Sequence, residues 1–320
     1  MQQPTIAIAT TVRDPGHSFV TWIAFHRQVA HKIYVYLDEP GPRDAALIPD
    51  LPEVRCFSGS QQSTMSGGNG VMERQIANVE RAYRQCLEDG IDWLIHIDGD
   101  ELLWSPEAAL SDFFAGLAPE VTTVSFVNHE VINVSHADDN FKELHFFKRN
   151  DGEAVYRNNL SYRHYPFFAF YGNGKSAVRV SDYKRPDGVH LFEVREGKRH
   201  IEREVCVLHY ACATYAEWLK KYAQLDAFQP YWWDDPCNPI RFPYHLDSRD
   251  SYLASKRTGD WNIAYDFYHR HLFTAAELDQ LRAVGVVFEV NLTLDRCDAG
   301  KSLLNAPLSA TITATSALSS

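Results

Sequence analysis

Short apolar runs alternate with helical repeats along the first 130 residues. Apolar side chains recur at helical spacing over 17–30 and 72–87, and Gly90 is placed to end the second helix. A Ser-Pro start predicts a further helix over 105–117. This alternation predicts an α/β fold with a mostly parallel sheet flanked by helices. Its strands are predicted at the β-branched or aromatic runs 5–11, 32–38, 54–57, 93–97 and 121–127.

The pattern becomes less regular beyond residue 130. Residues 306–320 are nearly all Ala, Ser, Thr and Leu, a composition that predicts a disordered tail. The chain is therefore divided into a first half, 1–130, a second half of the same domain, 131–305, and the tail. Within the second half we predict strands at 142–148 and 205–210 and helices at 215–228 and 274–284.

The strand predicted at 93–97 ends in the turn Asp98-Gly99-Asp100-Glu101. Three carboxylates within four residues repel one another unless a cation lies among them. Oxygen ligands suit Mg²⁺ or Mn²⁺, and a carboxylate-bound Mg²⁺ commonly completes its shell with substrate phosphates. The alternative is an acidic turn in which Asp is a turn former or helix cap. The pattern favours a Mn²⁺ or Mg²⁺ site for a diphosphate, with Asp98 and Asp100 as ligands.

Composition narrows the choice of partner. The 320 residues are 45% hydrophobic and carry a net charge of −11, so bulk attraction to nucleic acid or an anionic membrane is not expected. The six cysteines form no Cys-x-x-Cys pair and are typical of reduced core residues in a cytoplasmic protein. Neither a signal peptide nor a membrane-spanning segment is expected. In so acidic a chain, a diphosphate ligand would need a local cation.

Further polar residues follow predicted strands or glycine-rich turns. Ligands bind at the carboxyl ends of strands in α/β sheets, which draws attention to Asp38. The segment 172–176 suggests a Walker A loop, but Ala169 stands where that motif requires glycine. A glycine-rich loop that brings Lys175 to a phosphate is the better interpretation, and a solvated surface lysine is the alternative. The residues predicted to bind a nucleotide ligand are Thr11, Arg13, Asp38, Arg74, Asp98, Gly99 and Lys175.

Six blocks of this sequence resemble the family 92-like and family 2-like branch of the GT-A glycosyltransferases, in order and spacing, over roughly residues 5–225. The blocks are Trp22–His26, Lys32–Asp38, Gln75–Cys86, Asp92–Leu103, Gly174–Arg179 and Val207–Tyr210. The chain departs from that pattern in three places where the family binds the nucleotide base, which leaves the choice of nucleotide open. These places are Arg13-Asp14-Pro15, Thr21 and Asp38-Glu39-Pro40-Gly41.

The resemblance implies a GT-A, Rossmann-like fold in which 1–130 bind a UDP- or GDP-sugar donor and 131–305 bind a glycan acceptor. It implies a metal-dependent, inverting hexosyltransferase, with His209 as a third ligand beside Asp98 and Asp100. A buried, hydrogen-bonded histidine is the alternative for His209. Such transfer needs a cation to neutralise the leaving diphosphate and a base to deprotonate the acceptor hydroxyl. A lipid-linked acceptor would bring the enzyme to the membrane periphery.

Other functions fit the same acidic turn. One is a nucleotide-sugar diphosphate hydrolase or nucleotidyltransferase, and another is a non-catalytic module that binds a glycan or nucleotide sugar. For a transferase, chain order favours Asp187 or His190 as the base, with Glu130 next; Asp138, Asp139 and Asp182 are further candidates. An aromatic group could stack on acceptor sugars or belong to the core: Tyr162, Tyr165, Phe167, Phe168, Phe170 and Tyr171.

Overall fold

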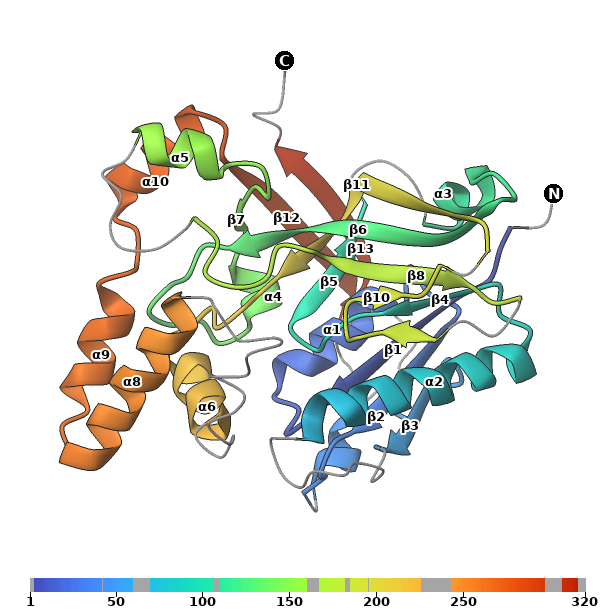
Figure 1. Cartoon of the computed structure of the whole chain (residues 1–320), viewed down its shortest axis with the longest axis horizontal. Helices are drawn as coiled ribbons and strands as arrows, with labels where there is room; N and C mark the ends of the chain where they lie inside the picture. Colours follow the sequence, from blue (N-terminus) through green and yellow to red (C-terminus); the bar gives the residue numbers. More distant parts are fainter. Residues whose placement is uncertain are drawn as a thin grey trace.

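The computed structural model describes residues 3–41, 43–59, 70–105, 110–159, 167–181, 185–194, 196–225, 243–296 and 307–315. A large sheet forms its centre (Figure 1). Four of its strands run parallel, in the order β3 (Val54–Ser58), β2 (Lys32–Leu37), β1 (Ile6–Val12) and β4 (Trp93–His96). The predicted α/β fold is confirmed.

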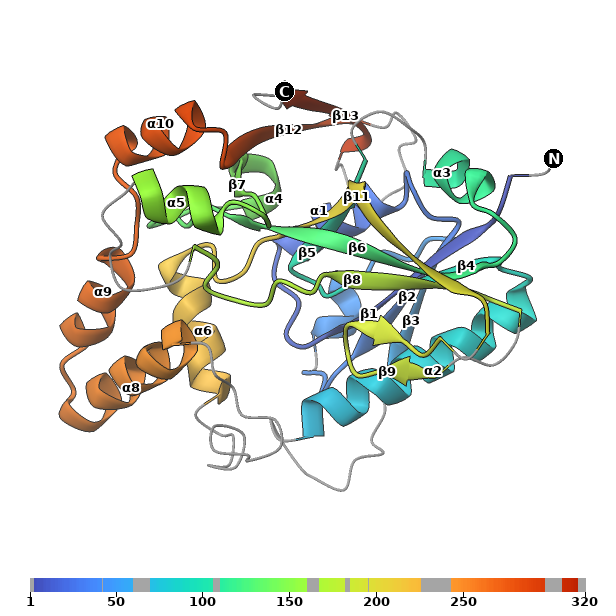
Figure 2. The same ribbon diagram turned by 45° about the horizontal axis from the view of Figure 1, so that its top comes forward.

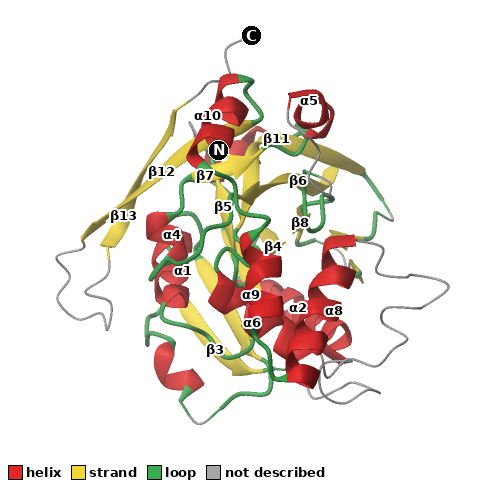
Figure 3. Ribbon diagram, turned by 90° about the vertical axis from the view of Figure 1, so that its left-hand side faces the viewer, coloured by secondary structure: helices red, strands yellow, loops and turns green. Residues whose placement is uncertain are grey.

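Two helices cover opposite faces of this parallel region (Figure 3). Successive side chains of a strand point to opposite faces, so Ile6 and Ile8 pack in the same cluster as α1 (Ser18–His26). Ala7 and Ala9 pack on the other face with α2 (Val71–Asp89). As predicted, α2 ends at Gly90, whose left-handed φ of 67° suits glycine.

The second half of the chain extends the same sheet. Strand β8 (Lys175–Arg179) lies antiparallel between β4 and β6 (Val121–Val131), and β11 (Lys198–His209) runs parallel to β6. Both predicted halves therefore contribute to one sheet. The other strands of this sheet are antiparallel to their neighbours: β5 (Glu101–Trp104) beside β11, then β7 (Phe146–Lys148), β12 (Val287–Arg296) and β13 (Pro307–Thr315).

Three helices gather beside this sheet, namely α6 (Tyr215–Leu225), α8 (Pro243–Thr258) and α9 (Asn262–His269) (Figure 2). They share a core around Trp218 and Tyr268, and the Tyr268 hydroxyl lies 2.9 Å from the carbonyl oxygen of Val134. Only α6 is predicted by the sequence. The buried face of α8 is Tyr244, Ser248, Tyr252 and Ser255, in which two serines interrupt the apolar repeat.

Two segments differ from their predicted structure. A strand is predicted from residue 142, but residues 140–143 form the short helix α4 (Asn140–Glu143). Asp139 caps this helix, because its side chain accepts a hydrogen bond from Phe141 N. Residues 307–315 are predicted to be disordered, but they pair with the edge of β12. The backbone groups at that edge can form hydrogen bonds with another strand, and composition alone does not predict such pairing.

Six further elements complete the part of the chain that the structure describes. The predicted start of the helix at 105–117 falls on 106–109, outside the described residues. In the described part of the chain, no helix has the length and apolar character needed to cross a membrane. The elements are the 3-10 helix η1 (Asp44–Leu47), α3 (Leu110–Gly116), α5 (Glu153–Asn159), α10 (Ala275–Ala283), β9 (Pro186–Asp187) and β10 (Leu191–Phe192).

Candidate functional site

Strand β1 lies between β2 and β4, so the order of the strands reverses at the β1–β4 junction. In open α/β sheets, ligands bind outside the carboxyl ends of the strands at such a point. Two segments leave the sheet here, 11–16 at the end of β1 and 98–100 after β4. Both segments line a cleft of about 450 Å³, and Tyr210, Cys212 and residues of α6 also line it.

Side chains of helix α1 form hydrogen bonds with the backbone of the acidic turn and of the strand that follows it. The indole Nε1 of Trp22 donates to the carbonyl oxygen of Glu101 at 2.6 Å and lies 3.2 Å from that of Asp98. One helical turn later, His26 Nε2 accepts from Leu103 N at 3.2 Å. Burial lowers the pKa of His26 to about 3, so the ring is neutral and can accept this hydrogen bond. The Trp22–His26 block therefore positions the turn.

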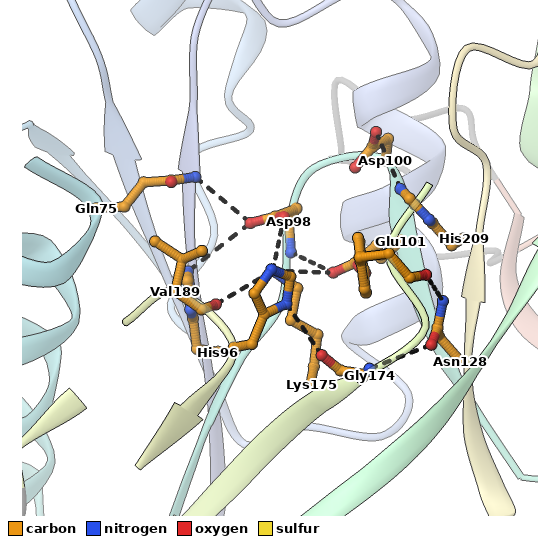
Figure 4. A network of polar contacts seen from close by, with 12 residues as sticks. Gln75, His96, Asp98, Asp100, Glu101, Asn128, Gly174, Lys175, Val189 and His209 are labelled. Carbon is orange, nitrogen blue, oxygen red and sulfur yellow. Dashed lines mark hydrogen bonds and ion pairs between the residues drawn. The ribbon is translucent and has the colours of Figure 1, made fainter. Parts of the chain in front are cut away.

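A buried lysine neutralises Asp98. Lys175 Nζ lies 2.6 Å from Asp98 Oδ2 and 3.7 Å from Glu101 Oε2, and its side chain is fully buried (Figure 4). Burial acts to raise the pKa of Asp98, but the charge and hydrogen bond of Lys175, together with His96, lower it on balance. Burial raises the pKa of Glu101 well above its usual value. The arrangement is thus an Asp98–Lys175 ion pair with the Glu101 carboxyl group beside it.

Asp100 turns away from this network and towards His209 (Figure 4). Its side chain is 45% exposed, and its Oδ2 lies 3.7 Å from His209 Nε2. Burial acts to raise the pKa of Asp100, but His209 holds it below its usual range. Register pairs His209 with Glu101 on β5, and Tyr210 N donates to the carbonyl oxygen of Asp100 at 2.8 Å.

Asp100 and His209 offer a partial cation site. Asp100 is accessible from the cleft, and the buried Nδ1 of His209 has no hydrogen-bond partner among the described residues. Asp98, also a predicted ligand, has one oxygen held by Lys175. Within the described ranges, no group of three or more His, Cys, Asp or Glu side chains is arranged to hold a metal. A divalent cation here would need substrate oxygens to complete its shell.

The predicted nucleotide-binding residues divide into two groups. Asp38 and Arg74 form a buried bidentate pair, with distances of 2.5 and 3.0 Å, and Lys175 lies beneath the acidic turn. None of these three lines the cleft. Lys175 begins a strand rather than a helix, which agrees with the failure of the Walker A pattern. The residues that do line the cleft are Thr11, Arg13, Asp98 and Gly99.

Glu130, a predicted base, is fully buried. Its carboxylate is paired with Lys148 and accepts hydrogen bonds from Ala169 N at 3.1 Å and Phe170 N at 3.0 Å. These contacts hold the segment that follows residue 167. Glu130 does not line the cleft, and its contacts are those of a structural anchor.

Asp187 and His190, the two favoured bases, also lie outside the cleft lining, whereas Asp182 lies outside the described residues. Asp187 is exposed on the β9–β10 ribbon. His190 Nδ1 donates to the Gly174 carbonyl oxygen at 3.1 Å, and burial followed by Lys175 lowers the pKa of His190 to about 4. A ring with so low a pKa is a weak base at neutral pH.

Two of the four described members of the aromatic group belong to the core. Phe167 and Phe170 are buried, and the Tyr171 ring lies 4.4 Å from the His190 ring and 4.6 Å from the His209 ring. Tyr162 and Tyr165 lie outside the described residues.

Sequence analysis missed one wall of the cleft. Residues 217, 220, 221 and 224 of α6 follow i, i+3, i+4, i+7 spacing and line the cleft together. Trp218 and Tyr222 anchor the opposite face in the core. The amphipathic repeat predicts the helix, but the direction of its polar face depends on the packing. Burial, with the charge of Asp100 and others, raises the pKa of Glu217, whose carboxylate also caps the helix at Thr214 N.

Among the described residues, three that are not glycine adopt left-handed backbone angles: Asp14 (φ 50°), Glu39 (φ 45°) and Cys212 (φ 45°). They follow β1, β2 and β11, and two of them line the cleft. Such conformations cost about 1–3 kcal/mol each and cluster at functional sites.

No model of a known protein family matches this chain. Comparison with the sequences of curated proteins finds two relatives. Two Arabidopsis thaliana proteins described as glycosyltransferase-like are 25% identical over 250 residues and 30% identical over 249 residues. Each match covers 67% of this chain, and they cover 48% and 55% of the relatives. The chain thus spans about half the length of the relatives that it matches.

Comparison of structures gives weaker likenesses. A 4-diphosphocytidyl-2C-methyl-D-erythritol synthase has a TM-score of 0.26 and 13% identity, over 42% of this chain and 64% of that protein. A Bacillus anthracis protein described as a putative glucose-1-phosphate thymidylyltransferase has a TM-score of 0.26 and 7% identity, over 40% of this chain and 56% of that protein. Scores this low have no bearing on function.

Proposed function

We propose that this protein is a glycosyltransferase that moves a sugar from a nucleoside-diphosphate sugar to a hydroxyl of a glycan acceptor, with inversion. The donor is a UDP- or GDP-sugar, and it binds in the cleft at the carboxyl ends of β1 and β4. The observation that carries the proposal is the position of the acidic turn 98–101, which opens on this cleft where the strand order reverses. The similarity to glycosyltransferase-like proteins supports the same class.

Charge gives the chemical reason for a metal at this site. Asp98 is neutralised by Lys175, but the Asp100 carboxylate faces the cleft, where a diphosphate would otherwise be repelled. A Mn²⁺ or Mg²⁺ ion held by Asp100, with His209 as a further ligand for Mn²⁺, would neutralise the leaving diphosphate. Trp22 and His26 fix the backbone of the turn and so position Asp100 for this role.

We expect nucleotide-sugar binding to require a divalent cation. A panel of UDP- and GDP-sugars, screened by thermal shift with and without MnCl₂, should contain a donor that raises the melting temperature only with metal. Calorimetry with that donor should show most of the affinity lost in EDTA. Equal affinity in MnCl₂ and EDTA would contradict the metal site. Turnover of the donor without any acceptor would favour a diphosphate hydrolase.

We expect His209→Ala to weaken Mn²⁺-dependent donor binding, with a partial recovery of activity at higher Mn²⁺ concentration. Neutral imidazole is an acceptable ligand for Mn²⁺, so its removal leaves a poorer but usable site. Melting temperature and Mn²⁺ affinity are measured on the same sample. His136→Ala is the control, because His136 is 77% exposed, lies near Asp138 and is not part of the cleft lining. Unchanged Mn²⁺ affinity in a destabilised His209→Ala protein would make His209 structural.

A further inference from the structure

Three cationic side chains line the cleft in the described part of the chain: Arg13, Lys220 and Lys221. Arg13 is paired with Glu39, and Lys220 Nζ lies 2.8 Å from Asp14 Oδ2. Among the described residues, Lys221 forms no ion pair with a carboxylate. Of these three side chains, Lys221 is therefore the one whose charge is available to a ligand in the cleft.

The surroundings of Lys221 keep its ammonium charged and partly dehydrated. The side chain is half-buried, and its Nζ lies 4.4 Å from the centre of the Phe170 ring, in cation–π geometry. Burial acts to lower the pKa of Lys221, but Cys212, Asp100 and other nearby groups raise it above its usual value. A partly dehydrated cation without a hydrogen-bonded anion is costly to hold, and a bound anion offsets that cost.

The packing of α6 directs this group into the cleft. Trp218 is fully buried, and its Nε1 donates to Ser248 Oγ at 3.1 Å, which fixes the rotation of α6 against α8. Lys221 then shares the cleft lining with Asp98 and Asp100. A group that carries two negative charges would meet both the cation proposed at Asp100 and a resident ammonium.

We propose that Lys221 binds the diphosphate of the donor. This inference rests on the proposed function and adds a residue from α6 that neutralises the leaving group together with the divalent cation. Because Lys221 lies in the second half of the chain, donor binding would join the two halves across the cleft. The alternative is a structural lysine that offsets the charges of Asp98 and Asp100 and covers Phe170.

The test compares UDP and GDP, each with saturating MnCl₂, by calorimetry. For whichever nucleotide the wild type binds, we expect Lys221→Met to weaken affinity by about 10- to 100-fold, the usual size of a lost charged hydrogen bond. Lys221→Arg should retain most of the affinity. Lys198→Met is the control for the loss of one lysine charge, since Lys198 is 72% exposed and lies outside the cleft lining, and it should bind like the wild type.

A structural lysine and a diphosphate ligand differ in their response to the monophosphate. We expect Lys221→Met to bind UMP or GMP with nearly the affinity of the wild type, so that the loss is specific to the diphosphate. Equal diphosphate affinity in wild type and Lys221→Met overturns the inference and leaves the proposed function standing. A wild type that binds neither UDP nor GDP with Mn²⁺ overturns the proposed function itself.

A measurement on the wild type tests the same proposal without requiring that a variant folds. Lysines are acylated with an N-hydroxysuccinimide ester, with and without the nucleotide and MnCl₂, and each site is quantified by mass spectrometry. Bound diphosphate should protect Lys221 and leave the labelling of Lys198, which lies outside the cleft lining, unchanged. Equal labelling of Lys221 under both conditions, at a saturating concentration, overturns the inference.

Discussion

Asp100→Asn should lower the rate of sugar transfer by about 10²- to 10⁴-fold while the protein remains folded. A bound metal supplies several kcal/mol of transition-state stabilisation, and each 1.4 kcal/mol is a factor of ten in rate. Asparagine keeps the shape of the side chain but removes the charge that would hold the cation. Asp100 is 45% exposed, and the amide oxygen of asparagine can still face the buried His209 Nε2. The measurement is turnover at saturating Mn²⁺, with the melting temperature recorded on the same sample.

Two further variants make this result specific. Asp98→Asn should also lose most of its activity, but it should melt earlier, because fully buried Lys175 loses its nearest carboxylate. Asp138→Asn is the control for removal of one negative charge, since Asp138 is 90% exposed and lies outside the cleft lining. Near wild-type turnover of Asp100→Asn would assign Asp100 a structural role and remove the metal from the proposal.

Lys148→Met should reduce the free energy of unfolding by about 3–5 kcal/mol, the usual result of removing one partner of a buried ion pair. Lys148 and Glu130 are 5% and 1% exposed, and methionine would leave the Glu130 carboxylate buried without its cation. The backbone hydrogen bonds from Ala169 and Phe170 would remain, so the segment after residue 167 should loosen rather than detach. Denaturant unfolding of the wild type and the variant measures the difference.

The control for this prediction is an exposed pair of the same kind. Lys198 Nζ lies 3.6 Å from Glu120 Oε1, and the two side chains are 72% and 52% exposed, so Lys198→Met should change stability by less than about 1 kcal/mol. Adding Glu130→Gln to Lys148→Met should restore part of the loss, because the stranded charge is then removed. If Lys148→Met costs no more stability than Lys198→Met, the buried pair does not anchor the segment.

The alternation of apolar strands and amphipathic helices determined the first half of the fold. Strands β1 to β4 and helix α2 fall where the periodicity places them, because each buries a face that is apolar at its own period. The acidic turn was visible too, since a run of carboxylates directly after a buried strand is a local feature. Helix α8 was not, because serines occupy half of its buried face, and neither was β13, which depends on the edge of β12.

Within the site, the sequence supplied the charged residues and the tertiary structure decided their partners. Nothing local distinguishes Asp98, which Lys175 neutralises from 77 residues away, from Asp100, which faces the cleft beside His209. Likewise, Asp38 and Arg74 were predicted to bind nucleotide, but they bind each other. Lys220 and Lys221 are adjacent in sequence, yet only Lys220 is paired with a carboxylate in the described structure. A charge is a property of one residue, whereas its neutralisation and exposure depend on which distant segments the sheet and α6 bring beside it.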